Sequence, residues 1–235
     1  MRYRLIGSTG RYRPHRTVEQ LGDFLLSNPE FLYVFKGLFD MELESLEEEE
    51  IQVLTISIMT QSQLVLEVRN DARVRRFSGL MREFVSRDLV DSGNTRGQLL
   101  EYLIYRKGPL SFWPIASMRI FRHCQVVQED GTPVGGSSNM DLGFVAWGKK
   151  RKNFHHLELV DCKFNLVNFL DNSSRCKKKL QYMLALTRCQ ICPEYVVGFV
   201  TLSTGVRDCI AYLKQEGYDE LTVYGYREVE ALLSS

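Results

Sequence analysis

The sequence has no long apolar run. None of its apolar stretches reaches the roughly 18–20 residues that a helix needs to span a bilayer. The N-terminus, MRYRLIGSTGRYRPHR, has no apolar core like that of a secretory signal. We therefore expect an intracellular, cytoplasmic protein with no membrane partner.

Paired cysteine motifs are scarce as well. The chain has six cysteines, which is too few for a disulfide scaffold at 235 residues, and in a reducing compartment they should remain thiols. Cys189 and Cys192 form one CxxC, but no second CxxC or HxxxH follows to complete a zinc site. The sequence thus predicts neither a disulfide framework nor a structural zinc ion.

Neither charge is in excess, since 30 basic and 29 acidic residues give a net charge of +1. This total excludes little, because a nucleic-acid enzyme with a basic surface also carries acidic metal ligands that cancel it. The distribution is more informative: acid gathers in 42–50, and base gathers in 2–16, 73–76, 149–152 and 175–179. Whether these runs are solvated faces or contact phosphate stays open.

The pattern of apolar residues changes near residue 92, although no repeat or low-complexity linker marks a boundary. Residues 1–92 are predicted to form a mainly helical module, with helices within 17–39, 42–61 and 72–89. Residues 93–235 are predicted to be α/β, a mixed sheet flanked by helices. Helices are expected over 95–106, 174–187 and 206–215, and strands over 118–128, 142–147, 155–164, 196–202 and 221–224.

Charged residues follow two neighbouring predicted strands of the second domain. Asp141 begins the first strand, and Asp161 and Lys163 lie two apart on the second, so they should share a face while Val160 and Cys162 point into a core. Charge near a sheet interior is costly unless it is paired or binds metal. Two carboxylates and a neighbouring backbone carbonyl suit Mg²⁺ or Mn²⁺, and the lysine can hold a phosphate or help to activate a water molecule.

This order resembles the PD-(D/E)xK nuclease superfamily over roughly residues 95–224. Met140 stands where the motif has proline, and the second acid is an aspartate. The resemblance implies a restriction-endonuclease-like fold with four catalytic residues: Asp141, Asp161, Lys163 and, on the preceding helix, Glu101. It also implies that the metal ligands are Asp141, Asp161, Glu101 and Cys162, the last through its backbone carbonyl.

Nucleic acid should then bind beside these carboxylates. The basic turn and the downstream helix supply the candidate contacts, namely Lys149, Lys150, Arg151, Lys152, Arg175, Lys178, Lys179, Gln181 and Tyr182. His155 and His156, at the start of a strand beside the basic turn, are expected to be neighbours of solvent or phosphate. Glu158 has the opposite parity to Asp161, which places it outside the predicted site.

Two functions from different classes remain. The first is a metal-dependent endonuclease that hydrolyses phosphodiester bonds, with DNA expected rather than RNA. The second is a nuclease-fold subunit without turnover, which acts as a binding or assembly module in a nucleic-acid-processing complex. Residues 1–92 could hold a protein partner or target the enzyme, and pairing of two copies into a homodimer is common among similar nucleases. A fold never settles a substrate.

Overall fold

A computed structural model describes residues 3–39, 50, 53, 57, 72–90, 94–112, 118–147, 154–171, 173–189 and 191–235. The chain forms two compact units, Met1–Tyr12 with Ile104–Leu232, and Arg13–Leu103 with Leu233–Ser235. Across the described residues, no helix combines the length and apolar character needed to cross a membrane.

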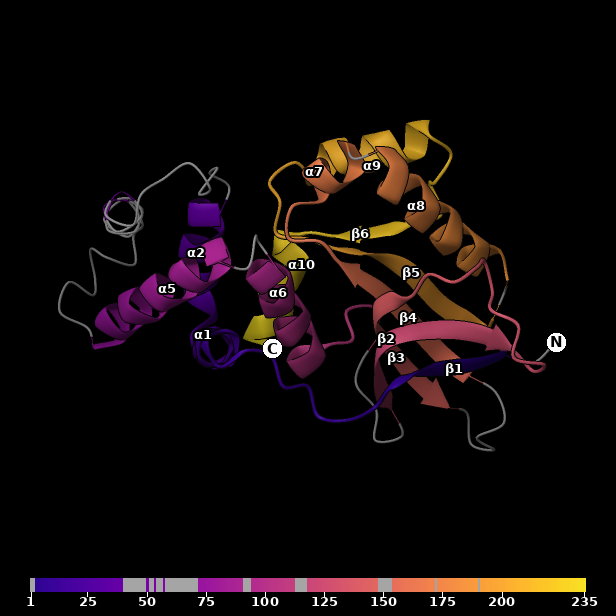
Figure 1. The fold of residues 1–235 in the computed structure, drawn as a ribbon, viewed down its shortest axis with the longest axis horizontal. Coiled ribbons are helices and arrows are strands. Elements are labelled where there is room, and N and C mark those ends of the chain that lie inside the picture. The colour runs from indigo at the N-terminus through magenta and orange to yellow at the C-terminus, as the bar shows by residue number, and fades with distance from the viewer. Residues whose placement is uncertain are drawn as a thin grey trace. The chain divides into compact units, whose positions relative to one another are not determined.

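The first unit is built on a six-stranded mixed sheet in the order β1-β2-β3-β4-β5-β6 (Figure 1). Its strands are β1 (Tyr3–Ser8), β2 (Arg119–Gln128), β3 (Met140–Trp147), β4 (Phe154–Cys162), β5 (Glu194–Val200) and β6 (Thr222–Tyr224). Strands β1 to β4 pair antiparallel, whereas β4, β5 and β6 pair parallel. Strand β4 therefore lies where the sheet changes from antiparallel to parallel.

Helices make the parallel connections. Between β4 and β5 run α7 (Leu166–Asp171) and α8 (Ser173–Arg188), and between β5 and β6 runs α9 (Val206–Gln215). Figure 1 shows these three helices together over one face of the sheet. The core between them contains Leu157 and Leu159 of β4, Leu180 and Met183 of α8, and Leu213 of α9. Helices on a partly parallel sheet make this unit α/β, as the sequence predicts.

The described part of the second unit is helical. It contains α1 (Arg16–Ser27), the 3₁₀ turn η1 (Pro29–Phe31), α2 (Leu32–Phe39), α5 (Ala72–Val90) and most of α6 (Asn94–Lys107), while α10 (Tyr226–Ser234) ends the chain. Phe24, Phe31 and Phe77 form an aromatic cluster with ring centroids 4.9–5.6 Å apart. Apolar residues at helical spacing thus make a core of their own.

The units do not divide the chain between residues 92 and 93. Strand β1 pairs antiparallel with β2, with Leu5 opposite Val126, so the first residues of the chain complete the sheet. The predicted segment 1–92 therefore includes one strand as well as helices. Of the helix predicted within 42–61, only residues 50, 53 and 57 lie among the described residues, and all three are helical.

Candidate active site at the end of strand β4

Asp141 and Asp161 lie side by side on neighbouring strands. The antiparallel register of β3 and β4 pairs Gly143 with Leu159, and two residues further along it places Asp141 opposite Asp161. Asp161 therefore has the same parity as Leu157 and Leu159, which pack beneath α8. Asp161 is fully buried, and the Asp141 side chain is 16% exposed.

Two lysines neutralise these carboxylates. The Nζ atom of Lys163 lies 2.6 Å from Oδ2 of Asp161 and 3.6 Å from Oδ2 of Asp141. The Nζ atom of Lys179, on α8, lies 2.5 Å from Oδ1 of Asp161, and it also donates to the backbone carbonyl of Asn139. Two negative and two positive groups thus form one cluster. Such pairing is what allows a carboxylate to remain buried.

A third oxygen completes the surroundings of Lys163. Its Nζ atom donates to the carbonyl oxygen of Cys162 at 3.4 Å. The backbone N–H of Cys162 in turn donates to Oδ2 of Asp141 at 2.8 Å, which holds that carboxylate in place. One ammonium group therefore has three oxygen atoms within 3.6 Å, from Asp141, Asp161 and the carbonyl of Cys162.

The two carboxyl groups respond differently to this environment. Burial alone would raise the pKa of Asp161, but Lys179 and Lys163 together outweigh it and hold that pKa below its usual value. Burial, followed by the charge of Asp161, raises the pKa of Asp141 to about 6, because the two lysines compensate it less. Asp141 is therefore the group of the pair that takes a proton first.

Lys163 remains an ammonium group in this arrangement. Burial would lower its pKa, but the charges of Asp161 and Asp141 reverse that effect and raise the pKa well above its usual range. The Nζ atom also lies 5.3 Å from the centre of the Phe169 ring, a distance at which a cation is attracted to the aromatic face. A raised pKa suits a group that holds negative charge rather than one that removes a proton.

Both faces of β4 are buried beside the cluster, in agreement with the expectation that Asp161 lies near the sheet interior. Val160 and Cys162 are buried as predicted, and Asp161, with the other parity, is buried as well. From Leu157 to Cys162 every residue of β4 is buried, whichever way its side chain points. The carboxylate cluster thus lies at the end of an apolar stripe beneath α8.

The predicted helix acid belongs to the other compact unit. Glu101 lies on α6 within the unit that contains Arg13–Leu103, whereas the carboxylates lie in the unit that contains Ile104–Leu232. A role for Glu101 as catalytic residue or metal ligand therefore stays a prediction.

The predicted nucleic-acid contacts have different outcomes. Lys149, Lys150, Arg151 and Lys152 lie outside the described residues, as does the side chain of Arg175. On α8, Lys178 and Gln181 are exposed, and their assignment as nucleic-acid contacts stays a prediction. Tyr182 is only 1% exposed and packs in the core between sheet and helix, which corrects its assignment as a nucleic-acid contact.

Lys179 makes a different contact from the one predicted. It was expected to contact nucleic acid, but it is an ion-pair partner of Asp161. The signal for this was helical spacing, since Lys179 lies three residues after Cys176 and four before Met183, both of which are buried. A lysine on the apolar face of a helix needs a buried acid, and Asp161 supplies it.

Glu158 lies outside this cluster. It is fully buried and accepts hydrogen bonds from the backbone N–H groups of Leu110, at 3.0 and 3.2 Å, and Ser111, at 2.6 Å, as well as from the Ser111 hydroxyl. Burial raises its pKa, although these donors act against that rise. Its carboxylate holds the loop that follows α6.

No protein-family model matches the chain, and no curated protein matches it either.

Proposed function

We propose that the protein is a divalent-metal-dependent endonuclease that hydrolyses phosphodiester bonds in nucleic acid, with DNA as the expected substrate. One observation carries the proposal: three oxygens of Asp141, Asp161 and the Cys162 carbonyl converge on a single cation, the ammonium group of Lys163. These are the oxygens that the sequence pattern assigns to a metal ion.

The donor set fits Mg²⁺ or Mn²⁺. Both are hard cations that prefer carboxylate and carbonyl oxygens, and they keep several waters when few protein ligands are present. Asp141, Asp161 and the carbonyl of Cys162 would hold the ion, with Glu101 as a predicted further ligand. When bound, such an ion stabilises the negative charge that develops on the phosphoryl oxygens.

The lysines of the cluster then have separate roles. Lys163 is 26% exposed, so on leaving the carboxylates its ammonium group can turn toward solvent and hold a phosphate oxygen or orient the attacking water. Lys179 is 12% exposed and remains paired with Oδ1 of Asp161, which keeps that carboxylate pointing toward the site. Lys178 and Gln181, exposed on the same helix, can position the phosphodiester backbone.

The order of elements also supports the proposal. The helix α6, the strands β2, β3 and β4, the helices α7 and α8, and the strand β5 follow one another as in the core of the PD-(D/E)xK nucleases that the sequence resembles. The acids lie at the start of β3 and the end of β4, as in that motif. Order and position together favour a restriction-endonuclease-like fold for this unit.

A second candidate function is an assembly module without turnover. It is favoured by the charge balance of the cluster, because two lysines already neutralise the two carboxylates without any metal ion. In that case Lys163 is a permanent structural cation, and the site binds no Mg²⁺ or Mn²⁺.

The first test is a cleavage assay with supercoiled plasmid, single-stranded DNA and RNA, each with Mg²⁺ or Mn²⁺ and with EDTA as a metal-free control. Asp161→Asn keeps the shape of the side chain but removes its charge. Asp219→Asn is the matched control, because it removes the same charge from an exposed position in the same unit.

We expect wild type and Asp219→Asn to cut at least one substrate in a metal-dependent way, and Asp161→Asn to lose about 10²–10⁴-fold in rate. Folded wild type that cuts none of the three substrates, and that binds neither metal ion by calorimetry, would overturn the nuclease proposal and favour the assembly module.

A further inference from the structure

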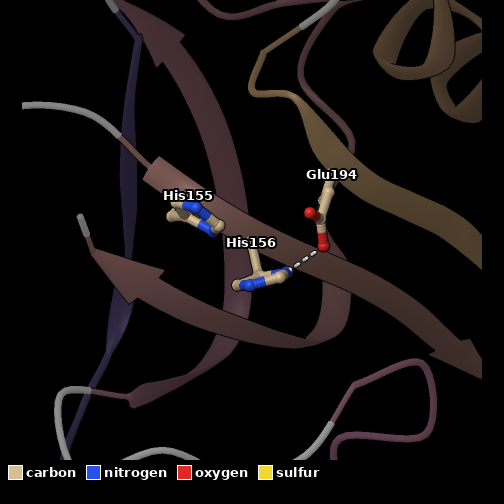
Figure 2. Close-up of side chains that lie close together, drawn as sticks. All are labelled: His155, His156 and Glu194. Atoms are coloured by element: carbon tan, nitrogen blue, oxygen red, sulfur yellow. Dashed lines mark ion pairs between the residues drawn. The ribbon is translucent and has the colours of Figure 1, made fainter.

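Three metal-ligating side chains lie together at the other end of β4. One ligand atom from each of His155, His156 and Glu194 lies within 4.8 Å of the other two, and among the residues that the structure describes this is the one such group of three or more His, Cys, Asp or Glu residues. Figure 2 shows the two imidazole rings beside each other on β4, with Glu194 reaching toward His156 from the start of β5.

A β-bulge explains how the side chains of two consecutive histidines can lie next to each other. The register pairs Ala146 with His156 and Trp147 with Phe154, which leaves His155 without a partner on β3. In a regular strand, successive side chains point to opposite faces, but a bulge inserts an extra residue and redirects its side chain. The two ring centroids accordingly lie 4.4 Å apart.

His156 is held in position by two neighbours. Its Nδ1 atom lies 2.7 Å from Oε2 of Glu194, the residue opposite it in the parallel register of β4 and β5. The Phe112 ring stacks on the imidazole, with centroids 4.9 Å apart and planes inclined by 20°. This side chain is 22% exposed, whereas that of Glu194 is 62% exposed. One ligand is therefore anchored, and the others can move toward it.

From this geometry we propose that His155, His156 and Glu194 bind a borderline first-row transition ion, of which Zn²⁺ is the representative. Imidazole nitrogens suit such ions, and two histidines with one carboxylate leave a coordination position for water. Metal–ligand bonds of about 2.0–2.1 Å require tetrahedral ligand atoms to lie about 3.3 Å apart. Rotation of the exposed His155 and Glu194 side chains about the anchored His156 ring can supply that spacing.

This site is separate from the carboxylate cluster. His156 and Asp161 are five residues apart on one strand, which corresponds to roughly 16 Å. The ligand chemistry differs as well, since nitrogen donors favour Zn²⁺ while an all-oxygen set favours Mg²⁺ or Mn²⁺. Zn²⁺ binding at the histidines therefore does not depend on nuclease activity.

The test titrates Zn²⁺ into the full-length protein by calorimetry at pH 7.5 in Mg²⁺-free buffer. The variants are His155→Gln, His156→Gln and Glu194→Gln. His123→Asn is the matched control, because it removes an exposed imidazole elsewhere in the same unit, and asparagine tolerates the positive φ of 47° at that position. Circular dichroism establishes that each variant is folded.

We expect one equivalent of Zn²⁺ to bind wild type and His123→Asn alike. Each of the other variants should bind at least about 100-fold more weakly, because losing a direct ligand costs more than the roughly 10–100-fold lost with an outer-shell partner. The Co²⁺-loaded protein should show the visible bands of a nitrogen–oxygen site without a thiolate charge-transfer band. The proposal is overturned if wild type binds no Zn²⁺, if the folded histidine variants bind as wild type does, or if Co²⁺ reports thiolate ligands from the cysteines.

Discussion

The two ends of strand β4 carry polar clusters of opposite character. At its C-terminal end, Asp161 is fully buried and its charge is balanced within the protein by Lys163 and Lys179. At its N-terminal end, His155 and Glu194 are exposed to solvent. Water can solvate the second cluster, whereas Asp161, the buried centre of the first, is stabilised by groups of the protein itself.

Because of this difference, a metal ion would have to displace different groups at the two ends of β4. An ion that enters the carboxylate cluster competes with the ammonium group of Lys163 for the same three oxygens. An ion that enters the histidine cluster displaces only water and the contact between His156 and Glu194. We therefore expect millimolar Mg²⁺ to be needed at the first cluster, whereas Zn²⁺ should bind tightly at the second.

The largest expected effect is that of Lys163→Met, which removes the competing cation while keeping an apolar stem. Cleavage should fall by about 10²–10⁴-fold, since the variant loses the group that we propose to hold phosphate or water. Mn²⁺ binding, in contrast, should become about tenfold tighter, because the two carboxylates are left with less internal compensation. Cleavage rates and calorimetry measure the two effects separately. Weaker Mn²⁺ binding in the folded variant would contradict the proposal that the Lys163 ammonium group and the metal ion compete for the same oxygens.

The next effect concerns stability. Asp161→Ala should lower the free energy of unfolding by about 3–5 kcal/mol, because it leaves the ammonium groups of Lys163 and Lys179 near the sheet interior without their main partner. Urea denaturation followed by circular dichroism measures the loss. Asp219→Ala, at an exposed position, should change stability by less than about 0.5 kcal/mol. A loss below about 1 kcal/mol for Asp161→Ala would mean that the lysines do not depend on it.

A third prediction concerns the dependence of stability on pH. The pKa of Asp141 rises from 3.8 to about 6 on folding, so the native state holds this proton more tightly than the unfolded chain between these values. The contribution of Asp141 to stability is therefore full below pH 3.8 and is lost as the pH rises through 6. Asp141→Asn does not titrate, so relative to wild type it should gain about 2–3 kcal/mol between pH 4 and pH 7.

Urea denaturation of both proteins at several pH values measures this gain. A difference between wild type and Asp141→Asn that stays constant across that range would show that burial does not raise the pKa of Asp141.

The smallest effect is expected at the exposed end. Without a metal ion, Glu194→Gln should cost less than about 1 kcal/mol, because the carboxylate is 62% exposed and solvent screens its pairing with His156. Thermal unfolding in the presence of EDTA tests this, and a cost near that of Asp161→Ala would remove the contrast between the two ends. With saturating Zn²⁺, wild type should instead unfold at a higher temperature than the variant.

Much of the sheet could be predicted from apolar patterns. The predicted strands 142–147 and 155–164 lie within two residues of β3 (Met140–Trp147) and β4 (Phe154–Cys162) at each end. Strand β1 was missed because it is a short edge strand in which only Leu5 is buried, so it has little apolar alternation. Helices α7 and α10 were missed as well.

The two clusters also differ in how far they could be predicted from the sequence. Asp141, Asp161 and Lys163 could be placed together because the two acids lie on consecutive strands and Lys163 follows two residues after Asp161, and the structure brings them together. The contact of Lys179 with Asp161 depends on how α8 packs on the sheet. The histidine cluster depends on a bulge and on Glu194, which lies 38 residues beyond His156 in the chain and becomes its neighbour only through parallel pairing.

The most direct measurement is a calorimetric titration of Mn²⁺ into wild type, Asp141→Asn and Asp219→Asn, with Zn²⁺ already saturating the histidine cluster. We predict a Mn²⁺ site in wild type and Asp219→Asn that Asp141→Asn loses, because the variant lacks one of the three oxygens with its charge. Equal Mn²⁺ binding by all three proteins, or no binding by any of them, would contradict the assignment of the carboxylate cluster as a metal-dependent nuclease site.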